Sequence, residues 1–136
     1  MTNFTAPQVG DTQSFRKTMT VAEQAMFTGI SGNLAPLHVD QRAARAAGFD
    51  GMLAFELAVT ALASTALNRL AGPGWRIGGL QLAFAAAVLV GDTIEAAVKV
   101  MQVSAESMTC SVRCSRASGD VVIEGTATLV PARPRG

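Results

Sequence analysis

Two side chains in this sequence can exchange protons near neutral pH from otherwise apolar surroundings. His38 is the only histidine of the chain and follows the turn-forming run Asn33-Leu34-Ala35-Pro36. An imidazole can both accept and donate a proton in this pH range. Glu56 lies within the apolar stretch of residues 52–67, where a charged side chain needs a partner or a function. We take both as candidate catalytic residues. Asn33 is a third, because its amide can hold a water molecule but cannot take its proton.

Each of these residues also fits a purely structural role. A histidine after a proline-containing loop can pack or cap, and an asparagine suits a turn. A glutamate in the first turns of a helix interacts favourably with the helix dipole, and it can also contact a second subunit. Thr60 and Ser64 can bond back to the carbonyl four residues earlier in a helix. The residue types alone leave these alternatives open.

Four short elements are predicted ahead of the apolar stretch: a strand over residues 13–17, a helix over 20–27, a loop over 31–37 and a helix over 40–47. Thr20 is expected to cap the first helix, with Glu23 three residues later completing a capping box. Asp40 is expected to cap the second helix, and Gly48 to end it.

A long helix is predicted over residues 51–70, with Asp50 as its N-cap. It is nearly apolar all round, so other structure must enclose it in a soluble protein. Its polar residues recur at every fourth position. Because four residues make slightly more than one turn, they form a single stripe that winds slowly around the helix: Glu56, Thr60, Ser64 and Asn68.

From residue 75 onward the hydrophobic period changes to two, which indicates antiparallel strands with one buried face. Strands are predicted over residues 75–90, 93–103, 108–115 and 121–130. Cys110 and Cys114 lie on one of them, about 13 Å apart, beyond the reach of a disulfide. We expect them to be reduced and buried, with metal binding or nucleophilic chemistry as the alternatives. One long helix followed by such a run of strands predicts an α+β fold with the sheet wrapped around the helix.

Three segments resemble a known family. Residues 31–40 read Ser-Gly-Asn-Leu-Ala-Pro-Leu-His-Val-Asp, and residues 48–57 read Gly-Phe-Asp-Gly-Met-Leu-Ala-Phe-Glu-Leu. They resemble the signatures Ser-Gly-Asp-x-Asn-Pro-(Ile/Leu)-His-x-Asp and Phe-Gly-x-x-Ile-Ala-His-Gly-Met of the MaoC-like, (R)-specific enoyl-CoA hydratase family. Residues 84–92 are similar to the family's later Phe-x-x-Pro-Val-x-Val-Gly-Asp stretch. The resemblance covers nearly the whole chain and implies the hot-dog fold.

The resemblance also implies chemistry at an acyl thioester. In that family the Asp and His of the first signature activate water for addition to a 2-enoyl thioester, and a backbone amide of the second polarises the thioester carbonyl. His38 is retained here, but Asn33 stands at the Asp position and Phe55-Glu56 at the His-Gly pair. The implied reaction is (R)-specific hydration of a 2-enoyl thioester, or the reverse dehydration, with an altered Asn/His dyad. His38 would be acid and base, Asn33 would position water, and the amide near Glu56 would stabilise the enolate oxygen. Substrate-binding positions are expected at Ala35, Phe55, Leu57 and Ser64.

Two further functions stay open. One is an acyl-CoA thioesterase, in which Glu56 or His38 activates water for attack on the carbonyl. The other is a non-catalytic subunit that binds acyl thioesters. The changes at Asn33 and Ala35 favour these two, whereas His38 and the order of the motifs favour hydration. The small residues at positions 83 and 85–87 suggest a roomy wall for the acyl group.

The whole chain fits a single domain over residues 1–136, with a frayed tail at 131–136. The expected substrate is an acyl-CoA or acyl-carrier thioester, with no metal and no other cofactor. The resemblance implies a homodimer. A net charge of +1 argues against nucleic-acid binding. The apolar stretch is shorter than the roughly 20 residues needed to cross a bilayer, and we see no signal-peptide pattern. We therefore expect no membrane association and, by default, a cytoplasmic location.

Overall fold

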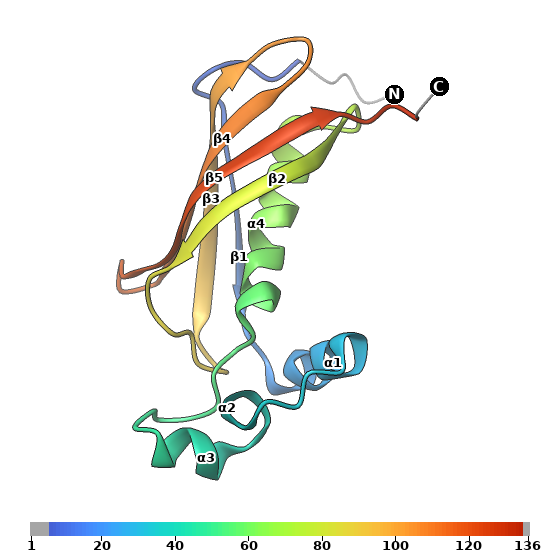
Figure 1. The fold of residues 1–136 in the computed structure, drawn as a ribbon. Helices are drawn as coiled ribbons and strands as arrows, with labels where there is room; N and C mark the ends of the chain where they lie inside the picture. The colour runs from blue at the N-terminus through green and yellow to red at the C-terminus, as the bar shows by residue number, and fades with distance from the viewer. Residues whose placement is uncertain (1–5, 135–136) are drawn as a thin grey trace.

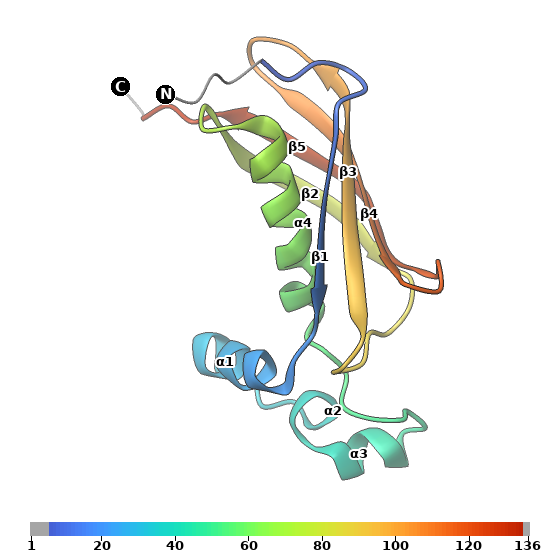
Figure 2. The same cartoon turned by 180° about the vertical axis from the view of Figure 1, so that it is seen from behind.

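A computed structural model describes residues 6–134 of the chain. Its elements are, in chain order, β1 (Thr12–Thr18), α1 (Val21–Ser31), α2 (Pro36–Val39), α3 (Gln41–Ala46), α4 (Glu56–Ala71), β2 (Trp75–Phe84), β3 (Thr93–Val103), β4 (Met108–Arg116) and β5 (Val121–Pro131). The strands form one antiparallel sheet in the order β1-β3-β4-β5-β2. The sheet curves along α4, and α1, α2 and α3 gather beyond the N-terminal end of α4 (Figures 1 and 2). The predicted α+β class and the packing of a sheet against a long helix are confirmed.

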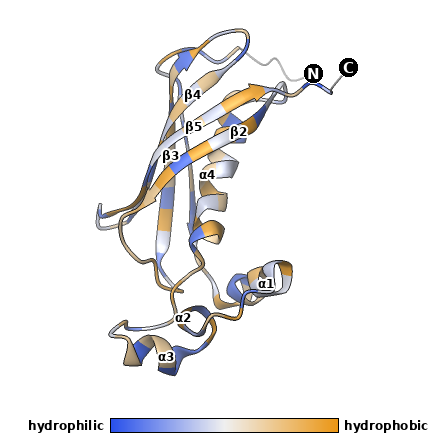
Figure 3. Cartoon of the chain, viewed as in Figure 1, coloured by the Kyte–Doolittle hydropathy of each residue, from blue (hydrophilic) through white to orange (hydrophobic). Residues whose placement is uncertain are grey.

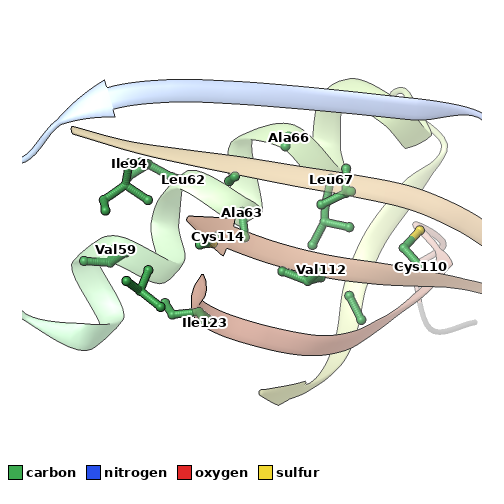
Figure 4. Packing of buried hydrophobic residues seen from close by; sticks show 14 of the residues in the cluster. Val59, Leu62, Ala63, Ala66, Leu67, Ile94, Cys110, Val112, Cys114 and Ile123 are labelled. Atoms are coloured by element: carbon green, nitrogen blue, oxygen red, sulfur yellow. The ribbon is translucent and has the colours of Figure 1, made fainter. Parts of the chain in front are cut away.

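The core lies between the sheet and the inner face of α4 (Figure 4). Leu62, Ala63, Ala66 and Leu67 project from α4 towards apolar side chains of the sheet, which include Ile94, Val112 and Ile123. Apolar and polar residues alternate along the strands (Figure 3), as the period of two predicts. Burying this apolar surface is the main favourable contribution to folding.

Cys110 and Cys114 lie on the inner face of β4 and are free thiols, as expected. Burial raises the pKa of each thiol to about 11, because an apolar environment disfavours the thiolate. Both therefore stay protonated at neutral pH and act as small hydrophobic side chains.

The long helix begins later than predicted. Residues 51–55 are not helical, and α4 starts at Glu56 with Phe55 as its N-cap residue. The reason is tertiary. The amide of Leu53 donates to the carbonyl of Leu37 (2.9 Å), and the amide of Ala54 donates to that of Val88 (2.7 Å). These bonds hold the segment extended between α2 and the loop before β3, so Asp50 caps no helix.

Helix α4 was expected to be buried on most sides, and the face that packs on the sheet meets this expectation. The opposite face is more open than expected, since Leu57, Ala61, Asn68 and Arg69 are exposed.

None of the described helices is long and apolar enough to cross a membrane.

The other predicted boundaries shift by smaller amounts. Thr20 and Asp40 cap α1 and α3 as predicted, but α1 continues to Ser31. Helix α2 begins within the predicted loop, with Pro36 at its first position, and runs past it to Val39. The strand predicted over 75–90 ends at Phe84. Instead of completing a capping box at the Thr20 amide, the Glu23 carboxylate accepts from the Thr20 hydroxyl and Lys17.

The chain stays in contact with the domain beyond residue 131, the predicted start of the frayed tail. Pro131 belongs to β5, and the amide of Ala132 donates to the carbonyl of Gly74 at 2.9 Å. Residues 135–136 of the predicted tail lie outside the described residues.

Gly125 in β5 is required by a close approach of the backbone of β2. A Cβ atom at this position would lie 1.9 Å from the carbonyl oxygen of Gln81. We expect Gly125→Ala to destabilise the protein by about 3 kcal/mol, since two paired strands must move apart. Chemical denaturation measures this change. Gly79→Ala is the control, because no atom lies within 4 Å of a Cβ at residue 79. Equal stability of the two variants would contradict the prediction.

Candidate active site

His38 lies on the short helix α2, with its imidazole almost fully enclosed. The side chain is 11% exposed, and Nδ1 lies 2.8 Å from the carbonyl oxygen of Leu53. A carbonyl oxygen can only accept, so this bond places the ring proton on Nδ1. The lone pair of the neutral imidazole is then on Nε2, which is the atom free to take a proton.

Glu56, the first residue of α4, faces that nitrogen. Its Oε2 lies 3.7 Å from Nε2 of His38, and its side chain is 52% exposed. The carboxylate thus faces the reactive nitrogen on one side and solvent on the other. It can stabilise an imidazolium once His38 has accepted a proton. The structure therefore brings together two of the three candidate catalytic residues.

Phe55 fixes the ring of His38 from one face. The two rings are stacked, with centroids 4.4 Å apart and an angle of 21° between planes. The ring of Phe27 on α1 lies on Phe55 at 4.8 Å. Phe55 is 2% exposed, so its side chain packs against His38 instead of lining an open surface.

Gln24 on α1 is bound to both segments of the site, although nothing in the sequence points to it. Its side-chain amide donates to the carbonyl oxygens of His38 (2.9 Å) and Leu53 (2.8 Å). Its carbonyl accepts from the amide of Phe55 at 3.4 Å. In the sequence Gln24 looks like one more polar residue of a surface helix. Only its hydrogen bonds to other segments show that it joins α1 to the site.

The start of α4 offers hydrogen-bond donors. Within residues 6–134 no acceptor is found for the backbone amides of Glu56, Leu57 and Ala58. First-turn amides have no partner within their own helix and carry the positive end of its dipole. They are suited to an oxygen that gains negative charge during a reaction.

A pocket of about 260 Å³ adjoins Glu56. Its wall includes the run Ala85, Ala86 and Ala87, and its floor includes Val59 and Ile123. The other side of the site opens on a pocket of about 300 Å³, where His38 and Gln24 face Leu34 and Met52. Three larger hollows lie elsewhere: one of about 750 Å³ over the sheet strands, one of about 780 Å³ near the C-terminal end of α4, and one of about 360 Å³ between α1, β1 and α4. They contain none of the candidate catalytic residues, so we place the site at the smaller pockets.

Comparison with known proteins identifies the family. The family model described as "MaoC like domain" matches residues 4–119. The chain belongs to the MaoC-like family.

Two curated relatives of this MaoC-like chain carry named activities. It is 35% identical over 127 residues to a protein of Rhodospirillum rubrum named (R)-specific enoyl-CoA hydratase, covering 91% of this chain and 88% of the relative. It is 31% identical over 124 residues to a Methylorubrum extorquens protein named 3-hydroxybutyryl-CoA dehydratase, covering 90% and 79%.

Solved structures agree with the fold. An (R)-hydratase from A. caviae involved in PHA biosynthesis superposes with a TM-score of 0.86 at 28% identity, covering 90% of this chain and 96% of that one. R-hydratase PhaJ1 from Pseudomonas aeruginosa gives 0.84 at 23% identity, covering 93% and 83%. The MaoC-like chain therefore has the hot-dog fold.

Asn33, Leu57 and Ser64 of this MaoC-like chain were also predicted as site residues. Asn33 is exposed, and its Oδ1 accepts from the amide of Ala35 at 2.9 Å, forming a turn ahead of α2. No hydrogen bond joins Asn33 to His38 or Glu56 in the described part of the chain. Leu57 is exposed at the start of α4, and Ser64 is half-buried two turns further along the helix.

Proposed function

We propose that this protein catalyses the (R)-specific hydration of 2-enoyl thioesters of CoA, or the reverse dehydration. The observation that carries the proposal is the arrangement at the N-terminus of α4. Nδ1 of His38 is bound to the carbonyl of Leu53, Nε2 faces the Glu56 carboxylate at 3.7 Å, and Glu56 at the start of α4 lines a pocket of about 260 Å³. The names of the two curated relatives support the same chemistry.

In the proposed reaction Nε2 of His38 takes a proton from water while the water oxygen bonds to the β-carbon of the enoyl thioester. Electrons from the double bond move to the thioester oxygen, where the first-turn amides of α4 stabilise the enolate. The imidazolium then returns its proton to the α-carbon, and the enolate collapses to the saturated 3-hydroxyacyl thioester. The sum is one water added across one double bond. The Glu56 carboxylate stabilises the imidazolium between the two steps.

Asn33 has a supporting role in this proposal. Its Oδ1 is engaged by the Ala35 amide, which leaves its NH₂ group to hold water at the entrance to the site. Glu56 supplies the negative charge that a carboxylate at the position of Asn33 would have supplied. The loss of that Asp is compatible with hydration on this basis.

The decisive experiment offers the purified protein a 2-enoyl-CoA and a saturated acyl-CoA in separate assays. Absorbance of the conjugated double bond follows hydration, and a thiol reagent follows release of CoA. Loss of the double bond without release of thiol is expected. Release of thiol from both substrates, with no hydrated product, would overturn the proposal.

Glu56 also favours a second candidate, an acyl-CoA thioesterase. A half-exposed carboxylate beside an imidazole and free amides can direct water to a carbonyl carbon. Thiol release from the saturated substrate is its signature in the same assay. Tight binding without either reaction would indicate a non-catalytic acyl-thioester subunit.

We propose further that two copies of the chain form a homodimer. Helix α1 carries exposed apolar side chains, with Met26 65% and Ile30 80% exposed, and Leu57 beside the site is 65% exposed. A second copy covering these residues would also close the site to bulk water. Analytical ultracentrifugation is expected to give twice the 14.0 kDa of one chain. A mass of 14.0 kDa at micromolar concentration would contradict the homodimer.

A further inference from the structure

Helix α1 is attached to the site by a polar residue. Its apolar residues Val21, Met26 and Ile30 are exposed, whereas Gln24 is its buried residue, at 7% exposure. Burying a side-chain amide is unfavourable unless its hydrogen bonds are made. The amide of Gln24 therefore needs partners in the segments that α1 covers.

Those partners belong to the two segments that carry the candidate catalytic residues. One N–H of Gln24 donates to the carbonyl of His38 on α2, and the other to the carbonyl of Leu53, three residues before Glu56. Its oxygen accepts from the amide of Phe55. All three bonds go to backbone atoms, so Gln24 fixes where both segments lie whatever their side chains are.

The carbonyl oxygen of Leu53 connects this amide to the imidazole. It accepts from Gln24 and from Nδ1 of His38, each at 2.8 Å. The position of this oxygen decides which ring nitrogen carries the proton, because it is the hydrogen-bond partner of Nδ1. Gln24 holds the oxygen in place, and the stack on Phe55 holds the plane of the ring.

We propose that Gln24 is a positioning residue that keeps His38 in the tautomer with its proton on Nδ1 and its lone pair on Nε2. It acts through the carbonyl of Leu53, because the hydrogen bonds of its side-chain amide all go to backbone atoms. The proposed hydration needs this tautomer, since the opposite one would present an N–H instead of a base to the water. The catalytic part of the inference therefore rests on the proposed function, but the tautomer itself does not.

The tautomer can be observed without any substrate. His38 is the only histidine, so protein labelled with ¹⁵N-histidine gives one pair of imidazole nitrogen signals. Protonated and unprotonated ring nitrogens resonate at well-separated frequencies. The unmodified protein at pH 8 is expected to show a protonated Nδ1 and an unprotonated Nε2. In Gln24→Met, which keeps the length of the side chain and removes its donors, the two signals should move towards each other as the tautomers mix.

Activity provides the second measurement. Gln24→Met is expected to lower kcat for hydration about 10-fold, within the range for a displaced catalytic group, with KM changed less than about 3-fold. Gln24→Glu serves as a second variant, because its carboxylate keeps an acceptor for the amide of Phe55 and loses both donors. Gln102→Met makes the same chemical change at an exposed position of β3 and is expected to leave both measurements unchanged.

The outcomes separate this inference from the proposed function. An unchanged tautomer with kcat within about 2-fold in a folded Gln24→Met protein would overturn the positioning role, whatever the reaction is. A mixed tautomer in that variant supports the role even if the unmodified protein fails to hydrate enoyl-CoA, in which case only the proposed function is lost.

Discussion

Replacing His38 with asparagine is expected to lower kcat for enoyl-CoA hydration by about 10²- to 10⁴-fold, the range for loss of a general acid–base group. An asparagine amide reaches the position of Nδ1 and can still donate to the carbonyl of Leu53, but it has no atom at the position of Nε2. The bond that anchors α2 to the segment before α4 is thereby preserved. Steady-state kinetics with a 2-enoyl-CoA measure the loss, and circular dichroism verifies the fold.

A glutamine at residue 38 is the matched comparison. It places an amide near the position of Nε2, where it can bind water but cannot take a proton. We expect His38→Gln to be as inactive as His38→Asn. If either variant kept more than about a tenth of the original rate, another residue would have to be the base.

Replacing Glu56 with glutamine is expected to lower kcat about 10²-fold. The change removes the negative charge 3.7 Å from Nε2 and keeps the size of the side chain, so the imidazolium formed during the reaction loses its stabilising partner. The backbone amide of residue 56 is unaffected, so KM is expected to change little. Hydration kinetics at several ionic strengths measure the loss, and added salt should weaken the effect of the partly exposed carboxylate.

The chain contains a matched control for this variant. Glu124 is 54% exposed, and its carboxylate lies 3.9 Å from the guanidinium of Arg113 on the surface of the sheet. Glu124→Gln removes the same charge from a similar ion pair away from His38. Surface pairs contribute about 0–1 kcal/mol, so neither variant should unfold. Equal rates in the Glu56 and Glu124 variants would show that Glu56 has no part in the reaction.

The sheet could be predicted from the sequence because apolar and polar residues alternate within the strands themselves. The alternation from Met108 to Cys114 depends only on which face is buried, and the structure buries the predicted residues. The start of α4 could not be predicted in this way. Residues 51–55 have the composition of a helix, but bonds to Leu37 and Val88 hold them extended, and no local pattern reports those partners.

The candidate site was predictable only in part, for the same reason. His38 and Glu56 stand out as ionisable residues in apolar surroundings, and the structure places them together across 18 positions of sequence. Gln24 escapes notice, since its importance lies in three backbone atoms contributed by other segments. Asn33 fits a turn as well as a site, and its exposed position keeps both interpretations available.

The segment between β1 and α4 carries most of the candidate site residues but contributes little to the main apolar core. Residues 19–55 carry Gln24, Asn33, His38 and Phe55, yet among the described residues only Met19 and Ala54 of that span belong to the main apolar core. Substitution of an exposed residue of this span, such as Asn33, therefore leaves the main apolar core intact. An aspartate in place of Asn33, as in the family signature, would therefore change the site without changing the packing of the sheet on α4. Residues at the site can thus change while the sheet and the core that supports it stay the same.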